Sequence, residues 1–198
     1  DGERLATDVY LPLGIQEKCP AVLVRTPYGK SKGTEVYWRF VQRGYAVVIQ
    51  DTRGREDSTG EWLPQHFEVE DGDDTLNWIA AQPWSDGQVS MTGGSYLGYV
   101  QWAAAASGNP HLKAMLSSVC AGSAFVDIPR RGGCFNSGML AWGFAMSERQ
   151  MRPELMAQEN WDEILKIRPL KDIPNIALGR EVDFLTKWLE HGDMDQFW

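Results

Sequence analysis

Short apolar blocks alternate with longer amphipathic ones in the first part of the chain, a pattern that predicts strands and helices in turn. Residues 4–11 alternate with a period of two, as a half-buried strand does. The later apolar blocks are continuous runs, which is typical of strands buried on both faces of a parallel sheet. These predicted strands cover residues 21–25, 46–51, 89–92 and 113–119.

Three segments between these strands carry apolar residues at helical spacing. Residues 34–43 end before Gly44, residues 73–82 begin with acidic side chains, and residues 96–106 follow a glycine-rich turn. Strands that alternate with helices in this order predict an α/β fold, with a mostly parallel sheet covered on both faces.

The pattern changes after about residue 122. We expect residues 1–122 to form the sheet domain and residues 123–198 to form a helical cap. Within the cap, the spacing predicts helices over 134–165 and 179–191, broken by prolines, and no further strand.

The composition describes a folded, acidic protein. Its 198 residues are 43% hydrophobic, include nine tryptophans and carry a net charge of −8. Nucleic acid is not an expected partner because no basic stripe is present, and no apolar run reaches the ~18–20 residues that span a membrane. The three cysteines, Cys19, Cys120 and Cys134, cannot all pair with one another, and none lies in a Cys-x-x-Cys motif. We therefore expect reduced thiols and a cytoplasmic location, with a secreted or periplasmic one left open.

Residues 89–98 carry the candidate chemistry. A β-branched run enters the turn Gly93-Gly94, places Ser95 at its apex and leaves into a predicted helix that begins at Tyr96. This is the layout of a nucleophile elbow, in which a strained turn exposes the serine hydroxyl and aims the next backbone N–H at a developing oxyanion. The motif departs from Gly-x-Ser-x-Gly, since Leu97 holds the last glycine position and Gly98 follows it. An ordinary strand–glycine–helix junction is the alternative.

Other motifs are weaker. Residues 25–31 resemble a phosphate loop, but Val24 stands where that loop needs its first glycine, and no Gly-x-Gly-x-x-Gly precedes Asp51 as a dinucleotide fold requires. The acids between 68 and 74 lack calcium-loop spacing, so we expect them to stabilise a helix N-terminus and predict no metal or cofactor. A catalytic triad needs a histidine base, for which the chain offers His66, His111 and His191; only His191 stands in the hydrolase order, without a strand ahead of it.

Several segments together resemble one family of α/β-hydrolases, which includes the X-Pro dipeptidyl-peptidases, cocaine esterase and the α-amino-acid ester hydrolases. The segments that resemble it include Arg-Thr-Pro-Tyr ending at Tyr28, Asp-Thr-Arg-Gly beginning at Asp51 and Gly-Gly-Ser-Tyr-Leu-Gly around Ser95. The resemblance extends over nearly the whole chain, through residues 1–12, 58–61, 74–79, 82–87, 142–144 and 193–198.

This resemblance implies a serine hydrolase that cleaves an ester or an X-Pro peptide through an acyl-enzyme on Ser95. The oxyanion would be held by the backbone N–H of Tyr96 and by the hydroxyl of Tyr28, unless Tyr28 is only a turn residue after Pro27. The cap would lie over Ser95. Its substrate contacts would come from Trp142, Phe144, Phe125 and Asp127, although Asp127 also suits a solvated loop.

The resemblance also implies that the chain is an N-terminal portion of a hydrolase. In the family, the catalytic acid and histidine follow the cap, on later strands of the sheet. We therefore expect them, and a jelly-roll domain that often follows, beyond Trp198. The sheet would then have an unpaired apolar edge. The alternative function is a catalytically silent domain that keeps the hydrolase fold for binding or scaffolding.

Overall fold

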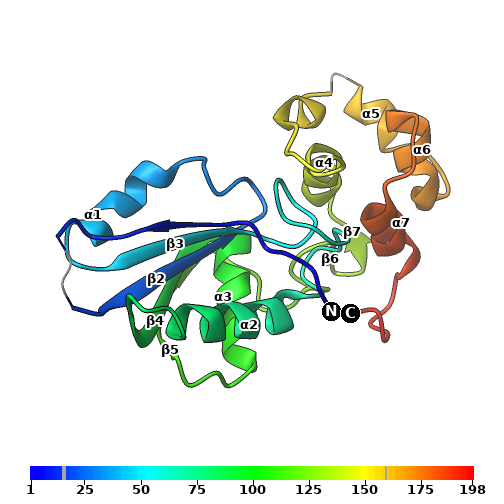
Figure 1. Cartoon of the computed structure of the whole chain (residues 1–198). Helices are drawn as coiled ribbons and strands as arrows, with labels where there is room; N and C mark the ends of the chain where they lie inside the picture. The colour runs from blue at the N-terminus through cyan, green and yellow to red at the C-terminus, as the bar shows by residue number, and fades with distance from the viewer. Residues whose placement is uncertain (15–16, 159) are drawn as a thin grey trace. The chain divides into compact units, whose positions relative to one another are not determined.

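Two compact units make up the chain, Asp1–Ala121 and Gly122–Trp198 (Figure 1). The computed structural model describes residues 1–14, 17–158 and 160–198.

The first unit is built on a five-stranded sheet with the order β1-β3-β2-β4-β5. β1 is antiparallel to β3, and every other neighbouring pair is parallel. The mostly parallel sheet predicted from the apolar blocks is therefore confirmed. The strands are β1 (Thr7–Tyr10), β2 (Cys19–Thr26), β3 (Ala46–Asp51), β4 (Ser85–Gly94) and β5 (Leu112–Ser118).

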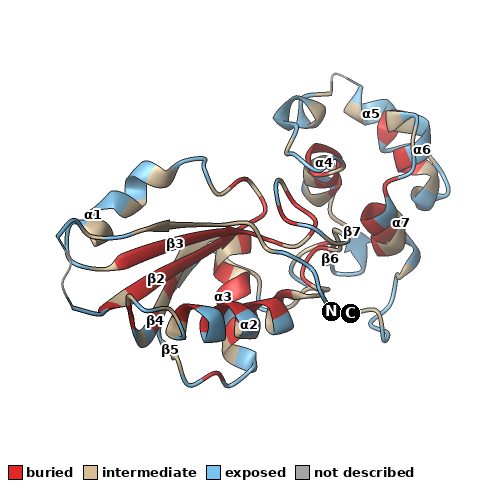
Figure 2. Cartoon of the chain, viewed as in Figure 1, coloured by how far each residue is buried: buried red, intermediate tan, exposed pale blue. Residues whose placement is uncertain are grey.

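Helices lie on both faces of this sheet (Figure 1). A 3-10 turn, η1 (Thr34–Tyr37), and α1 (Trp38–Val41) cover one face, and α2 (Glu68–Ala80) and α3 (Tyr96–Ala106) cover the other. The central strands β2 and β3 are almost continuously buried, as Figure 2 shows, because both of their faces are covered. A cluster on one face joins Val22, Val24, Val47 and Ile49 to aromatic side chains of η1 and α1, Tyr37 and Phe40.

Helix α2 begins at Glu68, five residues before the predicted start at 73. The first turn was missed because Glu68 and Asp71 are acidic yet buried, and so interrupt the apolar spacing. Their charges are matched by arginines of the sheet and of a loop. Glu70 also lies in the first turn of α2, where the positive end of the helix dipole favours a negative charge.

Strand β5 forms one edge of the sheet and, among the described residues, pairs only with β4. Its burial is partial: Leu116, 66% exposed, and Val119, 89% exposed and directly after the strand, are far more exposed than the apolar residues of the central strands. The expected apolar edge is thus present.

The second unit begins with a hairpin that the sequence did not predict. β6 (Arg130–Arg131) and β7 (Cys134–Phe135) pair across Gly132 and Gly133, both of which have positive φ angles as the turn requires. The prediction of no further strand was therefore wrong. The charged pair Arg130-Arg131 carries no apolar alternation, so the pattern gave no strand signal there.

Short helices make up the rest of this unit. The predicted helix over 134–165 is divided into several pieces at its turns and prolines, and a further helix forms at 173–178, outside the predicted ranges. The pieces are α4 (Ser137–Ala145), η2 (Pro153–Met156), α5 (Trp161–Ile164), η3 (Leu170–Asp172), α6 (Ile173–Leu178) and α7 (Asp183–Glu190).

Trp188 is the centre of the second unit's core. Its indole is fully buried, stacks on Trp142 at 6.0 Å and meets Phe184 edge-on at 5.6 Å. Arg130 ties the hairpin to α7 by donating hydrogen bonds to the carbonyls of Trp188 and Leu189. Every helix in the described part of the chain is too short or too polar to span a bilayer.

Candidate active site

Ser95 occupies a strained turn between β4 and α3. Its backbone is left-handed in φ, with φ 57° and ψ −123°, and its side chain is exposed. Such a conformation costs about 1–3 kcal/mol in a non-glycine residue and persists only where the surroundings hold it. Here the N–H of Ser95 donates to the carbonyl of Ser118 at 3.0 Å, and its carbonyl accepts from Gly98 and Tyr99 at 2.9 and 3.1 Å.

Glycines allow this turn to close, and they explain the unusual motif. Gly93 has φ +145°, and a Cβ there would lie 2.4 Å from the Cβ of Leu97. Because Gly93 leaves that space empty, a leucine fits two residues after the serine. Gly98 meets a different neighbour, since its Cβ would lie 2.7 Å from the Cβ of Cys120, just after β5. The second glycine is therefore needed at 98, not at 97.

The register of the sheet brings Tyr28 and Ser95 to the same side of the sheet, at the carboxyl ends of the parallel strands. β2 and β4 are parallel neighbours, and Leu23 pairs with Met91. Thr26 and Gly94, each three residues farther along, therefore end their strands at the same level. Adjacent strands lie about 4.8 Å apart, so the loop after β2 and the elbow after β4 leave the sheet side by side.

The loop that carries Tyr28 is anchored on both sides of the tyrosine. The N–H of Tyr28 donates to the hydroxyl of Thr26 at 3.1 Å, and the buried Arg55 donates from Nε to the carbonyl of Pro27 at 3.2 Å. Asp51, at the end of β3, accepts the N–H of Lys30 at 2.6 Å. Burial raises the pKa of Asp51, against the lowering effect of that hydrogen bond. Asp51 and Arg55 thus act on the loop of Tyr28, a role the sequence did not indicate.

The side chain of Tyr96 points into the first unit. Its hydroxyl donates to a carboxylate oxygen of Glu68 at 2.7 Å and accepts the N–H of Gln65 at 3.0 Å. Its ring lies 5.8 Å from that of Trp62. Burial, and then the charge of Glu68, hold the pKa of Tyr96 well above its ordinary value, so the phenol keeps its proton.

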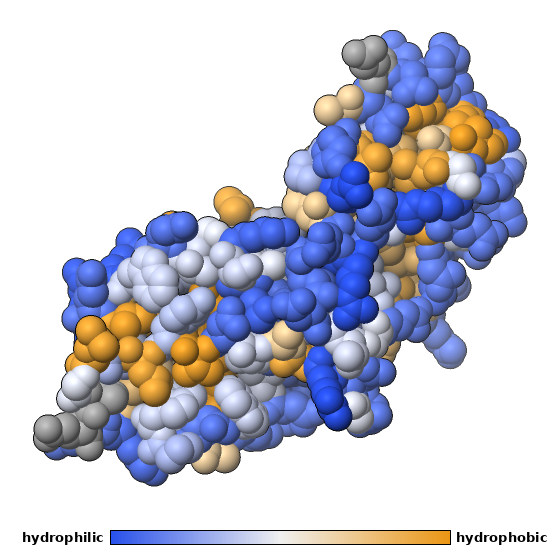
Figure 3. Space-filling model, turned by 45° about the horizontal axis from the view of Figure 1, so that its top comes forward, coloured by the Kyte–Doolittle hydropathy of each residue, from blue (hydrophilic) through white to orange (hydrophobic). Residues whose placement is uncertain are grey.

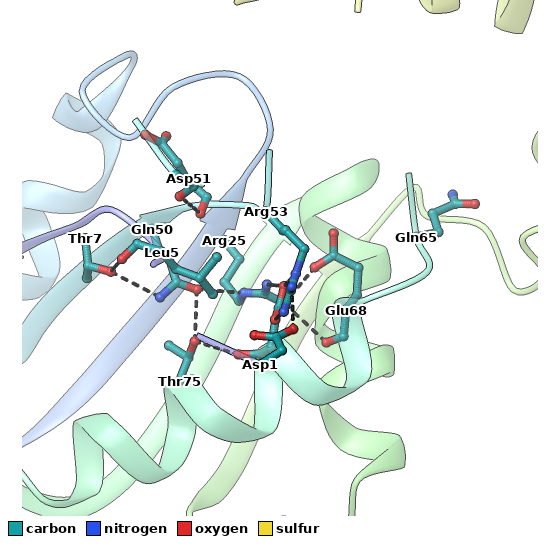
Figure 4. A network of polar contacts seen from close by, with 12 residues as sticks. Asp1, Leu5, Thr7, Arg25, Gln50, Asp51, Arg53, Gln65, Glu68 and Thr75 are labelled. Carbon is teal, nitrogen blue, oxygen red and sulfur yellow. Dashed lines mark hydrogen bonds and ion pairs between the residues drawn. The ribbon is translucent and has the colours of Figure 1, made fainter. Parts of the chain in front are cut away.

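Glu68 belongs to a buried polar network (Figure 4). It forms an ion pair with Arg25 at 2.7 Å, and both side chains are almost fully buried. Arg25, near the end of β2, also donates to Gln50 at 2.9 Å, and Gln50 in turn accepts the hydroxyl of Thr75. Asp71 extends the network to Arg53, which donates to it at 3.0 Å. The acids of α2 therefore serve as buried partners as well as helix-end charges.

No hydrogen bond joins the Ser95 hydroxyl to another described residue of the first unit. Of the three histidines, His111 precedes β5 and so lies at the amino ends of the parallel strands, opposite the elbow. His66 contacts the carbonyl of Pro64 at 3.2 Å. His191, in the second unit, contacts Asp195 at 2.7 Å through Nδ1 and stacks on Phe197.

The predicted substrate contacts have differing environments in the second unit. Phe144 is fully buried against Trp161, so in this structure it supports the core and presents no surface. Phe125 is half-buried and lies 5.2 Å from Trp198. Asp127 is exposed and accepts the N–H groups of Gly122 and Ser123, which suits the loop alternative.

A cavity of about 380 Å³ opens elsewhere in this unit, lined by Arg130, Phe135, Leu140, Ile173 and other residues. None of the predicted contacts lines it. Figure 3 shows that the surface facing the viewer is mostly polar, with apolar residues gathered in separate patches. Within the described ranges, no group of three or more His, Cys, Asp or Glu side chains is arranged to hold a metal ion.

Known proteins are similar to this chain in sequence and in fold. Cocaine esterase of Rhodococcus sp. (strain MB1 Bresler) is 37% identical over 225 residues, an alignment that covers 100% of this chain and 38% of the esterase. The structure of an α-amino acid ester hydrolase superposes with a TM-score of 0.79 at 25% identity, covering 100% of this chain and 37% of that one. An aminopeptidase from a marine sediment Thaumarchaeota archaeon shares the fold with a TM-score of 0.80 at 23% identity, with the same coverage.

The chain therefore spans little more than a third of the length of these relatives. The α/β-hydrolase fold expected from the resemblance is confirmed by the solved structures. The family described as X-Pro dipeptidyl-peptidase (S15 family) matches residues 1–198, and with the full-length similarity to cocaine esterase this shows that the chain belongs to the S15 family of α/β-hydrolases.

Proposed function

We propose that this chain carries the nucleophile and the oxyanion hole of a serine hydrolase that cleaves small esters or short peptides through an acyl-enzyme on Ser95. The observation that carries the proposal is the backbone of Ser95, strained at φ 57° and ψ −123°, with an exposed side chain at the N-terminus of α3. Strain of this kind is a mark of functional sites, and the positive end of a helix dipole favours a nearby oxyanion.

In the proposed reaction, the hydroxyl oxygen of Ser95 attacks the substrate carbonyl carbon while a general base takes its proton. The tetrahedral oxyanion accepts hydrogen bonds from the N–H of Tyr96 and the hydroxyl of Tyr28. Collapse breaks the bond to the leaving alcohol or amine, which receives the proton from the base. Water, activated by the same base, then hydrolyses the acyl-enzyme.

We place the base and its supporting acid in sequence beyond Trp198, since the relatives are much longer than this chain. Trp142, Phe125 and Asp127 of the second unit stay predicted substrate contacts. A cytoplasmic location also stays a prediction.

The proposal is tested by exposing the protein, as its gene encodes it, to a fluorophosphonate probe and measuring its intact mass. We expect one adduct, which peptide mapping assigns to Ser95. Ser95→Ala should abolish both labelling and the hydrolysis of p-nitrophenyl esters. Ser107→Ala is a matched control because Ser107 is an exposed serine at the other end of α3. Labelling that persists in Ser95→Ala, or none in the wild type, refutes the mechanism and favours the silent binding domain.

Tyr28→Phe tests the second oxyanion donor. Loss of one such donor costs about 10²–10³ in kcat, so we expect a fall of that size with the fold intact. An unchanged kcat, or a loss of folding, would instead assign Tyr28 to the turn. Comparing a p-nitrophenyl ester with an alanyl-proline p-nitroanilide then separates esterase from X-Pro peptidase activity.

A further inference from the structure

One side chain links the candidate oxyanion donor to the buried ion pair of the first unit. The hydroxyl of Tyr96 donates to Glu68 at 2.7 Å, and Glu68 pairs with Arg25 at 2.7 Å. The side chains of Arg25 and Glu68 are 0% and 5% exposed, so water does not screen this pair. Since the N–H proposed to hold the oxyanion belongs to the same residue, whatever fixes the ring of Tyr96 also restricts the direction of that N–H.

A second strained residue meets the same hydroxyl. Gln65 has φ 74° and lies in the loop before α2, and its N–H donates to the Tyr96 hydroxyl at 3.0 Å. Gln65 and Ser95 therefore both have positive φ angles; Gln65 contacts the hydroxyl of Tyr96, and Ser95 precedes Tyr96 in the chain. Such conformations persist only when several contacts determine them together. The phenol is a contact common to the loop, the ion pair and the elbow.

We propose that Glu68, held in place by Arg25, is a positioning residue that aims the backbone N–H of Tyr96 at the oxyanion by anchoring the Tyr96 side chain. The inference rests on the proposed function. An oxyanion donor is effective only when it lies about 2.7–3.1 Å from the developing charge, so a small rotation of the first turn of α3 weakens it. The anchor prevents that rotation.

A purely structural contact would not need these groups. Burying a carboxylate and a guanidinium carries a desolvation cost, and an apolar replacement of similar volume often gives a fold of equal stability. Phenylalanine in place of Tyr96 would also retain the packing against Trp62. The hydrogen bond to Glu68 fixes the orientation of the Tyr96 side chain, because a hydrogen bond restricts the donor–acceptor angle and apolar packing does not.

The test compares Tyr96→Phe, Glu68→Ala and Glu68→Gln in the protein as its gene encodes it. We expect Tyr96→Phe and Glu68→Ala to lower kcat for a p-nitrophenyl ester, and the rate of fluorophosphonate labelling, by about 10–100-fold, part of the loss for a whole oxyanion donor. KM should stay within about threefold, since the contact acts in the transition state. Glu68→Gln keeps a carbonyl oxygen for the phenol and should recover most of kcat.

Tyr37→Phe is the control, because it removes a half-buried phenol of the first unit on the α1 side of the sheet. If Tyr96→Phe folds and keeps kcat and labelling within twofold of Tyr37→Phe, the positioning role is overturned while the proposed function stands. Equal losses for Glu68→Gln and Glu68→Ala overturn it as well. If the wild type is neither labelled nor active, it is the proposed function that fails. Should Glu68→Ala not fold, Tyr96→Phe alone decides.

Discussion

The empty space at Gly93 gives a prediction that can be worked out from the structure. In Gly93→Ala, the new Cβ would meet the Cβ of Leu97 at 2.4 Å, where ordinary contacts begin at 3.4 Å, and alanine would have to adopt φ +145°. The strained backbone costs about 1–3 kcal/mol, and overpacking costs about 1–3 kcal/mol more. We therefore expect the free energy of unfolding to fall by about 2–6 kcal/mol, which lowers Tm by about 5–20 °C in a chain of this size.

A double-mutant cycle separates the two costs. Leu97→Gly removes the atom that the new Cβ would strike but leaves the φ angle unchanged. Gly93→Ala should then cost about 1–3 kcal/mol less in the Leu97→Gly background than in the wild type, measured by urea unfolding. Gly44→Ala is the matched control, since Gly44 has φ +89° and nothing within 4 Å of a Cβ. Its cost should be the same in both backgrounds. An equal cost of Gly93→Ala in both backgrounds would refute the steric account of the motif.

Two further predictions concern the buried polar network. The folded pKa of Tyr96 lies well above its unfolded value of about 10, so its contribution to stability is complete below pH 10 and is lost as pH rises through the folded pKa. Tyr96→Phe lacks this contribution. Above pH 10 its unfolding free energy should therefore fall less steeply with pH than that of the wild type, by up to about 1.4 kcal/mol per pH unit. Parallel curves of unfolding free energy against pH would show that the pKa of Tyr96 is not raised in the folded state. Arg25→Met leaves Glu68 charged and buried and should cost about 3–5 kcal/mol in urea unfolding, most of which Arg25→Met/Glu68→Gln recovers. A double variant no more stable than Arg25→Met would show that the uncompensated charge is not the cause.

Local sequence patterns predicted the elements whose structure is determined by residues close together in the chain. β3 (Ala46–Asp51) and α3 (Tyr96–Ala106) have the bounds predicted for them, because each is an apolar run with a clear end. The turn at Ser95 was likewise readable, since strand, glycine turn and helix are consecutive. The hairpin at 130–135 was missed although Gly132-Gly133 is a turn signal, because its strands are only two residues long.

The roles that the sequence did not predict depend on contacts between residues that are far apart in the chain. Glu68 and Asp71 look like surface acids until Arg25 and Arg53, far away in sequence, are placed beside them. Similarly, Asp51 carried no assigned role, because its contact with Lys30 depends on how two loops meet at the sheet edge. The role of Tyr28 as an oxyanion donor was predicted from the family resemblance alone. The register of β2 and β4 then supplied a physical reason for it, by ending both strands at one level.

On the proposed mechanism, both oxyanion donors belong to the first unit, and each is held there by its own buried charges. Asp51 and Arg55 fix the loop of Tyr28, while Glu68 and Arg25 fix the side chain of Tyr96. Preorganised donors stabilise charge without rearranging during the reaction, which is the largest single contribution in many enzymes. On this mechanism, the buried charges at the carboxyl ends of the strands would have one common function, which is to hold the two proposed oxyanion donors in place. That function would explain why they are kept although burying a charge carries a desolvation cost.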